Sequence, residues 1–314
     1  MLKYIVKRLA MLIIVTMGVT LITFSMMHWA PGDPAELMAI SRYGLESVNE
    51  QNIARIRVEE GLDAPIFVQY WHWLEHTWRG DLGRSIVTGD LVLDEIRLKI
   101  PATFELALAA LIISLIIALP AGIISAVKQY SPVDYLTMTG ALLGVSIPNF
   151  WLGLLLILLF SVTLGWLPVF GYGTFKHMVL PAVTLGAGMA AITTRLIRSS
   201  MLGVLRQDYI ITARSKGLSE GSIIHNHALK NSLIPVITVI GLQIGHLLEG
   251  AVIVEVIFAW PGIGKLLVDS IFARDFFMIQ GCVLLFAVIF VIVNLLVDIS
   301  YIYLDPRIRH KKEY

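Results

Sequence analysis

Charged residues are scarce in this chain of 314 residues, because Asp, Glu, Lys and Arg together make up only 15% of it. Soluble domains carry about 25% charged residues and roughly 45–50% apolar ones. Here 57% of the residues are hydrophobic, and the mean hydropathy is +0.78. The composition therefore argues against a soluble protein and indicates a chain embedded in a lipid bilayer.

Cysteine is nearly absent, and so is any excess of charge. The single cysteine, Cys282, lies within an apolar run, so one chain cannot form a disulfide framework or a cysteine-based metal cluster. The net charge of +1 gives no sign of a nucleic-acid partner, and none is expected.

A phosphate-binding loop is missing as well. Such a loop requires the pattern G-x-x-x-x-G-K-[ST]. The nearest stretch, WPGIGKLL at 260–267, lacks both the first glycine and the hydroxyl residue. The chain is therefore not expected to bind ATP itself.

Long apolar runs dominate the sequence. About 20 apolar residues are needed to cross the hydrocarbon core as a helix. We therefore predict an all-α membrane protein with six transmembrane helices. The predicted spans are Leu9–Trp29, Ala102–Val127, Leu136–Leu164, Met178–Leu196, Leu233–Phe258 and Met278–Tyr303.

The first run follows three cationic residues, as a signal peptide would. It is longer than the apolar part of such a peptide and lacks a clear small-x-small cleavage site, so we expect it to be retained as a span.

Lysine and arginine are distributed unequally between the two sets of span ends, and cytoplasmic loops carry the excess. The short loops of one side contain only Lys176, Lys265 and Arg274. The other side contains Lys3, Lys7, Arg8, Lys128, Arg195, Arg198, Arg206, Arg214, Lys216, Lys230, Arg307, Arg309, Lys311 and Lys312. Both termini and the 200–232 segment are therefore predicted to be cytoplasmic, and the long segment after the first span is predicted to face outward.

This outward segment contains helical patterns and the stretch YWHWLEHTW, whose tryptophans favour the headgroup level of a membrane. HWLEH at 72–76 also matches the zinc-protease pattern H-x-x-E-H, in which His72 and His76 would be ligands and Glu75 the base. A membrane zinc metalloenzyme is thus an alternative, but the segment shows no third ligand and no substrate cleft. We favour an interfacial helix and expect no metal site.

Proline and polar residues occur within the apolar runs. Pro120, Pro148 and Pro181 are expected to interrupt their helices. Polar groups at membrane depth usually face a bundle interior or water. Asn149 and the stripe of Gln243, His246 and Glu249, spaced by three, are therefore candidates for the translocation pathway, with interhelical hydrogen bonding as the alternative.

A polar, glycine-punctuated segment separates the predicted fourth and fifth spans. Apolar residues at every fourth position, Leu205, Tyr209 and Ala213, predict a short amphipathic helix from Gly203 to Lys216. Gly217 suits the left-handed residue that ends such a helix, and Ser219 suits the cap of the next one, which continues to Pro235. The result is a helix–turn–helix elbow at the membrane surface.

The elbow motifs TARSKG at 212–217, HALKN at 227–231 and SLIP at 232–235 resemble the cytoplasmic loop of ABC-importer permeases of the dipeptide, oligopeptide and nickel family. Ile211 replaces a glutamate of the general pattern, the interval from Gly217 to Pro235 is longer, and Phe277 stands where the family has proline. The resemblance extends along the chain through PGDPA at 31–35, GLDAP at 61–65, RGDLGRS at 79–85, PATFELA at 101–107, GVSIPNFWLG at 144–153, LGWLP at 164–168, HMVLPAVTLG at 177–186, RSSML at 198–202, FAWPGIGKLLVDSIFARD at 258–275, NLLVD at 294–298 and DPRIRHKK at 305–312.

The resemblance implies a type I ABC-importer permease in a bacterial or archaeal cytoplasmic membrane. Its implied partners are a second, related permease, two cytoplasmic ATPases that bind ATP and Mg, an extracytoplasmic substrate-binding protein and membrane lipid. The subunit itself would need no cofactor and carry no catalytic residue. The residues carried over as ATPase contacts are Tyr209, Thr212, Ala213, Ser215, Lys216 and Gly217.

These predictions divide the chain into an N-terminus with the first span (1–30), an extracytoplasmic loop (31–101), a five-span core with the elbow (102–304) and a cytoplasmic tail (305–314). The implied substrates are peptides or nickel. The short loop Gly165–His177 favours nickel or small peptides, and glutathione remains open.

Overall fold

The computed structural model describes the backbone of residues 2–29, 32–44, 46 and 48–304. It describes their side chains except at positions 2–9, 12, 26, 27, 41, 234, 246, 248 and 298–304. The predicted tail 305–314 lies outside the described residues.

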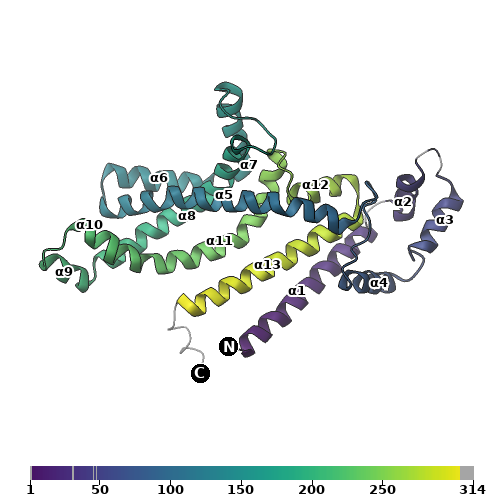
Figure 1. Cartoon of the computed structure of the whole chain (residues 1–314), viewed down its shortest axis with the longest axis horizontal. Coiled ribbons are helices and arrows are strands. Elements are labelled where there is room, and N and C mark those ends of the chain that lie inside the picture. Colours follow the sequence, from purple (N-terminus) through teal and green to yellow (C-terminus); the bar gives the residue numbers. More distant parts are fainter. Residues whose placement is uncertain (1, 30–31, 45, 47, 305–314) are drawn as a thin grey trace. The chain divides into compact units, whose positions relative to one another are not determined.

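Within the described part of the chain every regular element is a helix (Figure 1), apart from an isolated bridge between Arg84 and Leu91. The elements are α1 (Leu2–Trp29), α2 (Pro34–Tyr43), α3 (Glu50–Glu59), α4 (Ile66–Trp78), α5 (Val92–Val127), α6 (Pro132–Ser146), α7 (Asn149–Leu156), the π-helical η2 (Ile157–Thr163), α8 (Phe175–Leu205), α9 (Asp208–Ser215), α10 (Glu220–Ser222), the π-helical η3 (Ile223–Leu229), α11 (Lys230–Ile257), α12 (Ile263–Ala273) and α13 (Phe276–Leu304).

Three helices are long and apolar enough to cross a membrane: Val92–Val127, Phe175–Leu205 and Phe276–Val297. Two bent helix pairs, Pro132–Ser146 with Asn149–Thr163 and Glu220–Leu233 with Pro235–Gly245, raise the number to five if each pair is one span. The chain is thus an all-helical membrane protein with three to five candidate spans among its described residues, and the number six stays a prediction.

The predicted third span, Leu136–Leu164, is divided between two helical segments, and the chain bends by 108° between them. Ile147 is extended, as expected for a residue that precedes proline, and Pro148 starts the new helix α7. The prediction that Pro120 and Pro181 also interrupt their helices is wrong, because α5 and α8 continue through them. A helix tolerates an internal proline when neighbouring groups satisfy the carbonyl that it frees.

The chain forms two compact units. The first comprises residues 1–102 and 261–291, and the second comprises residues 103–260 and 292–314. In the first unit, α2 and α3 pack together around an apolar cluster of Ala35, Met38, Ala39, Ile56, Ile86 and Phe276.

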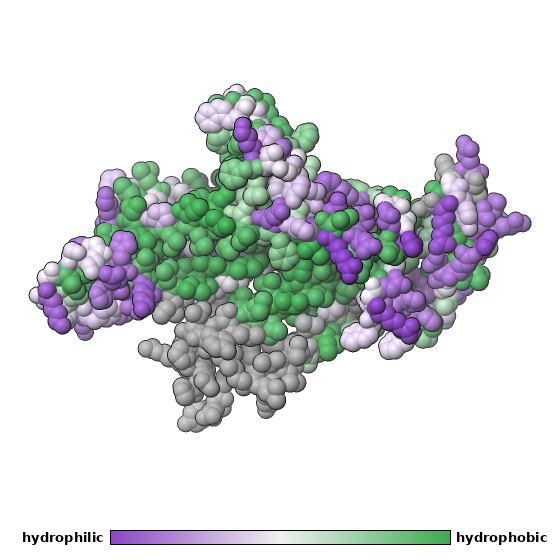
Figure 2. Space-filling view, in the orientation of Figure 1, coloured by the Kyte–Doolittle hydropathy of each residue, from purple (hydrophilic) through white to green (hydrophobic). Residues whose placement is uncertain are grey.

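In the second unit α8 is the central helix and packs against α6, α7 and α11. Two glycines allow α5 to approach it closely. A Cβ atom added at Gly186 would lie 2.6 Å from the carbonyl oxygen of Ala110, and one added at Gly122 would lie 2.7 Å from Ile197 Cβ. Figure 2 shows apolar side chains over α6, α8 and α11, whereas polar ones gather at the α9–α10 end of this unit.

A buried ion pair fixes α6 to α8. Asp134, which is 2% exposed, accepts hydrogen bonds from Arg198 Nε at 2.6 Å and Nη2 at 2.7 Å. Its carboxylate also accepts from the Ser125 hydroxyl and from the Tyr130 backbone N–H at 2.9 Å. Every oxygen of Asp134 is thus engaged, as a buried carboxylate requires.

We expect Asp134→Ala to lower the free energy of unfolding by about 3–5 kcal/mol, because the replacement leaves a largely buried Arg198 without its counter-charge. Asp94→Ala is the matched control, since it breaks an exposed pair with Arg97 at 3.5 Å and should cost less than about 1 kcal/mol. Unfolding of the purified protein in detergent measures both, and equal losses would contradict this account of the junction.

Candidate functional site

The predicted elbow is present in the second unit, but its first helix starts later than predicted. Helix α8 ends at Leu205, Gln207 is extended, and α9 runs from Asp208 to Ser215. Asp208 in the first turn is favourable at the positive end of the helix dipole. The elbow helix is therefore separated from α8 by a break at Arg206 and Gln207.

The turn after α9 follows the predicted pattern. Gly217 has φ +79°, a left-handed conformation that glycine adopts without strain. Ser219 then caps the next helix by accepting a hydrogen bond from the Ser222 N–H at 3.4 Å. From Glu220 the chain stays helical through α10, η3 and α11, with a bend of 48° between Leu233 and Pro235.

Three kinds of contact fasten α9 to these following elements. Ile210 and Ala213 bury their side chains against Ile223 of η3. Asn231 Nδ2 of α11 donates a hydrogen bond to the Tyr209 hydroxyl at 3.0 Å. Helix α9 is thus held by α11 and η3, whereas the chain break separates it from α8.

The third contact is an ion pair across the turn. Arg214 binds Glu220 through two hydrogen bonds of 2.7 and 3.1 Å. The hydrogen bond from Arg214 lowers the pKa of the Glu220 carboxyl. The pair therefore contributes at neutral pH and is lost as the pH falls through this lowered pKa, and its solvent exposure makes the contribution small and sensitive to salt.

Five of the six predicted ATPase contacts lie on the surface of the elbow. Tyr209, Thr212, Ser215, Lys216 and Gly217 are all exposed. The hydroxyls of Thr212 and Ser215 donate to backbone carbonyls one turn earlier, so they lie flat along α9.

The sixth, Ala213, is only 7% exposed, and its side chain is part of the apolar contact with Ile223. Sequence reasoning overlooked Glu220 and Asn231, although Asn231 belongs to the quoted motif HALKN and Glu220 stands six residues after a charge of opposite sign.

Among the pathway candidates, Asn149 lies where three helices meet. It follows the bend at Pro148 and is half-buried. A Cβ atom added at Gly188 of α8 would lie 3.8 Å from its Oδ1, and one added at Gly250 of α11 would lie 3.4 Å from its Nδ2. Both distances are ordinary van der Waals contacts, so the amide lies beside α8 and α11 without being crowded by them.

The predicted polar stripe on α11 does not face one environment. Gln243 is 6% exposed and donates to the Thr193 hydroxyl at 3.4 Å, and its carbonyl oxygen has no hydrogen-bond partner among the described residues. Glu249 is exposed, and the side chain of His246 lies outside the described residues. Gln243 thus faces α8, whereas Glu249 is exposed.

The geometry gives no support to a zinc enzyme. Glu75 Oε1 accepts a hydrogen bond from Arg79 at 2.6 Å, and His76 faces Asp81 at 3.3 Å. No group of three or more His, Cys, Asp or Glu residues suited to a metal ion occurs in the part of the chain that the structure describes.

Comparison with protein families decides the identity of the chain. Residues 118–310 match the family described as "Binding-protein-dependent transport system inner membrane component", and residues 1–107 match the N-terminal region of such membrane components. The chain belongs to this family. It is therefore a multi-pass inner-membrane permease subunit of an ABC transporter rather than its ATPase, and such subunits carry no cofactor.

Curated relatives match this permease over its whole length. It is 44% identical over 311 residues to the glutathione transport system permease protein GsiC of Escherichia coli K12. This alignment covers 99% of this chain and 100% of the relative. It is 43% identical over 338 residues to the dipeptide transport system permease protein DppB of Alkalihalophilus pseudofirmus, with the same coverage.

Solved transporters share the fold of part of the permease. An inward-facing structure of the MetNI methionine ABC transporter matches with a TM-score of 0.57 at 16% identity, and covers 67% of this chain and 96% of that chain. An amino acid ABC transporter solved with histidines matches with a TM-score of 0.52 at 15% identity, over 66% of this chain and 92% of that chain. The similarity in fold therefore extends over two thirds of the permease.

The hydrogen bond between Asn231 of α11 and Tyr209 of α9 can be tested by substitution. We expect Asn231→Ala to speed hydrogen exchange of the α9 amides about fivefold, because one hydrogen bond between side chains contributes roughly 0.5–1.5 kcal/mol. Asn226→Ala is the control, since that amide donates to Ser222 one turn away and does not reach α9 in the described part of the chain. Mass spectrometry of deuterium uptake measures the difference, and unchanged exchange in α9 would show that Asn231 does not hold it.

Proposed function

We propose that this permease moves short peptides from an extracytoplasmic binding protein across the cytoplasmic membrane by alternating access. Its relatives named for glutathione and dipeptide transport, at 44% and 43% identity over 99% of the chain, carry this proposal. Since the whole chain aligns with both, we infer a small peptide or peptide-like substrate. Nickel is the alternative that the same experiment tests.

We further propose that six spans cross the membrane, with both termini and the elbow in the cytoplasm. The excess of Lys and Arg at one set of span ends supports this orientation. A second, related permease would complete the pathway, and two ATPases would bind below it. The segment 31–101 would then face outward, and the core 102–304 would carry the substrate.

The elbow is the proposed contact with an ATPase. Its exposed residues Tyr209, Thr212, Ser215, Lys216 and Gly217 would enter a groove of that partner, while Ala213 would fix α9 on the permease side. Because three contacts fasten α9 to α10, η3 and α11, closure of the ATPases would move α11 together with α9.

The proposed pathway candidates have different roles. Asn149 and Gln243 lie at contacts with α8, where they would change partners when the helices repack. Glu249, which is exposed, would face the pathway or the second permease. His246 remains a pathway candidate because it stands three residues before Glu249 in the sequence.

Uptake by the complete transporter in liposomes tests the proposed function. We expect ATP-dependent accumulation of labelled glutathione or dipeptides when the binding protein is present, and none without ATP. Saturable nickel uptake in place of peptide uptake would overturn the proposed substrate.

Charge reversal in the elbow tests the proposed coupling. We expect Lys216→Glu to reduce uptake at least about tenfold, because a reversed charge at a protein contact opposes association. Lys128→Glu is the control, since Lys128 is an exposed cation outside the elbow. Equal uptake by the two variants would contradict a contact at α9.

A further inference from the structure

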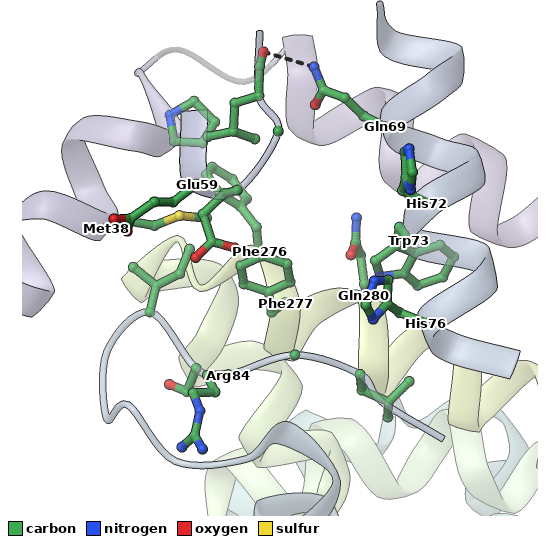
Figure 3. A pocket seen from close by; sticks show the side chains of 18 of the residues that line it. Met38, Glu59, Gln69, His72, Trp73, His76, Arg84, Phe276, Phe277 and Gln280 are labelled. Atoms are coloured by element: carbon green, nitrogen blue, oxygen red, sulfur yellow. Dashed lines mark hydrogen bonds between the residues drawn. The ribbon is translucent and has the colours of Figure 1, made fainter. Parts of the chain in front are cut away.

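The first unit contains a pocket, here called the cup, that has no role in the proposed function. It has a volume of about 970 Å³ and is lined by the end of α1, α2, residues 58–62, α4, residues 81–91 and the start of α13. In Figure 3, Phe276 and Phe277 lie in its middle, between Met38 and Glu59 on one side and Trp73 and His76 on the other.

Polar ties fix the helical walls of the cup. Arg42 of α2 binds Glu60 and, at 3.3 Å, Glu59, so the end of α3 is held against α2. Gln69 Nε2 of α4 donates to the backbone carbonyls of Leu62 at 3.0 Å and Ala64 at 2.8 Å. The α3–α4 connection is therefore fixed before any partner binds.

The remaining wall is fixed to the floor through Asp275. This buried carboxylate accepts hydrogen bonds from the Ser85 hydroxyl and, at 3.2 Å, from the N–H groups of Ile86 and Met278. It thus caps α13 and holds the 81–91 segment at the same time. A preformed pocket loses little conformational entropy on binding, which favours affinity.

The charges around the cup leave one cation without a counter-ion. Glu59 and Glu60 bind Arg42, and Asp81 faces His76. Arg84 is exposed and donates to the Gly89 carbonyl at 3.1 Å, and it forms no ion pair among the described residues. The cup therefore combines an aromatic floor with a positive charge at its rim.

We propose that this cup is a socket for the extracytoplasmic binding protein, which inserts an apolar side chain flanked by a carboxylate. The apolar side chain would pack on Phe276, Phe277 and Trp73, and the carboxylate would bind Arg84. A buried aromatic anchor surrounded by a polar rim with arginine is the usual composition of a protein–protein hot spot. The inference rests on the proposed outward orientation of the 31–101 segment.

Two sequence features support this assignment. Phe277, which departs from the proline of the family pattern, is part of the floor, and the Trp- and His-rich stretch of α4 is a wall. Both features therefore line the same cavity.

Charge reversal at the rim tests the socket. The complete transporter in nanodiscs is mixed with the peptide-loaded binding protein of the same system, and association is followed at several salt concentrations. We expect Arg84→Glu to slow association at least about tenfold and to weaken its salt dependence, because rim charges act mainly on the association rate. The control Arg97→Glu reverses an exposed cation outside the cup and should bind like the unmodified protein.

Cross-linking identifies the occupant independently of folding effects. A benzophenone amino acid in place of His72, an exposed residue of the cup, should cross-link to the binding protein. Cross-links only to lipid or to the loaded peptide would overturn the proposal, as would equal association rates for the Arg84 and Arg97 variants. If the unmodified transporter neither binds the protein nor takes up peptide, the proposed function fails together with the socket.

Discussion

The hydrocarbon core of the bilayer offers no water to backbone N–H and C=O groups, so each spanning segment of this permease must satisfy these groups within a helix. This constraint explains why the described elements are all helical and why the long apolar runs become α5, α8 and α13. It also places irregular backbone, such as the elbow turn and the segments around the cup, between the long helices. Both candidate interaction sites are therefore found where the helices end.

Close packing and an ion pair hold the helices of the second unit together. Gly122 and Gly186 bring α5 against α8, and Asp134 joins α6 to Arg198 of α8. A core built in this way transmits displacement, because packed helices repack between discrete arrangements and do not deform continuously. The elbow is attached to this core through α11, since Tyr209 and Asn231 join α9 to it across the turn.

Much of this architecture follows from the sequence alone. Hydropathy predicts the long helices, and Gly217 and Ser219 mark the elbow turn because their local conformational preferences suffice there. Pro148 correctly predicts the interruption of the third span, whereas hydropathy alone does not, since an apolar run looks the same whether it is straight or bent by 108°.

Other features depend on tertiary contacts that spacing does not encode. The ion pair of Asp134 with Arg198 joins residues 64 positions apart, and the bond of Asp275 with Ser85 joins residues 190 apart. The predicted stripe on α11 does not stay on one face because of the geometry of the helix. Six residues turn an α-helix by about 600°, so the directions of Gln243 and Glu249 around the helix axis differ by about 120°. Family resemblance supplied the elbow contacts, whereas the apolar spacing placed Ala213 on the inward face of the elbow helix, which its packing with Ile223 confirms.

We expect α9 and α11 to move as one body while the transporter works. Replacing Tyr209 and Asn231 by cysteines and joining them with a short bifunctional thiol reagent tests this coupled motion, with peptide uptake in liposomes as the readout. We expect uptake to fall in the uncross-linked double variant, which lacks the hydrogen bond between the two helices, and to recover when the cross-link joins them again. A further loss of uptake on cross-linking would show instead that α9 must move relative to α11.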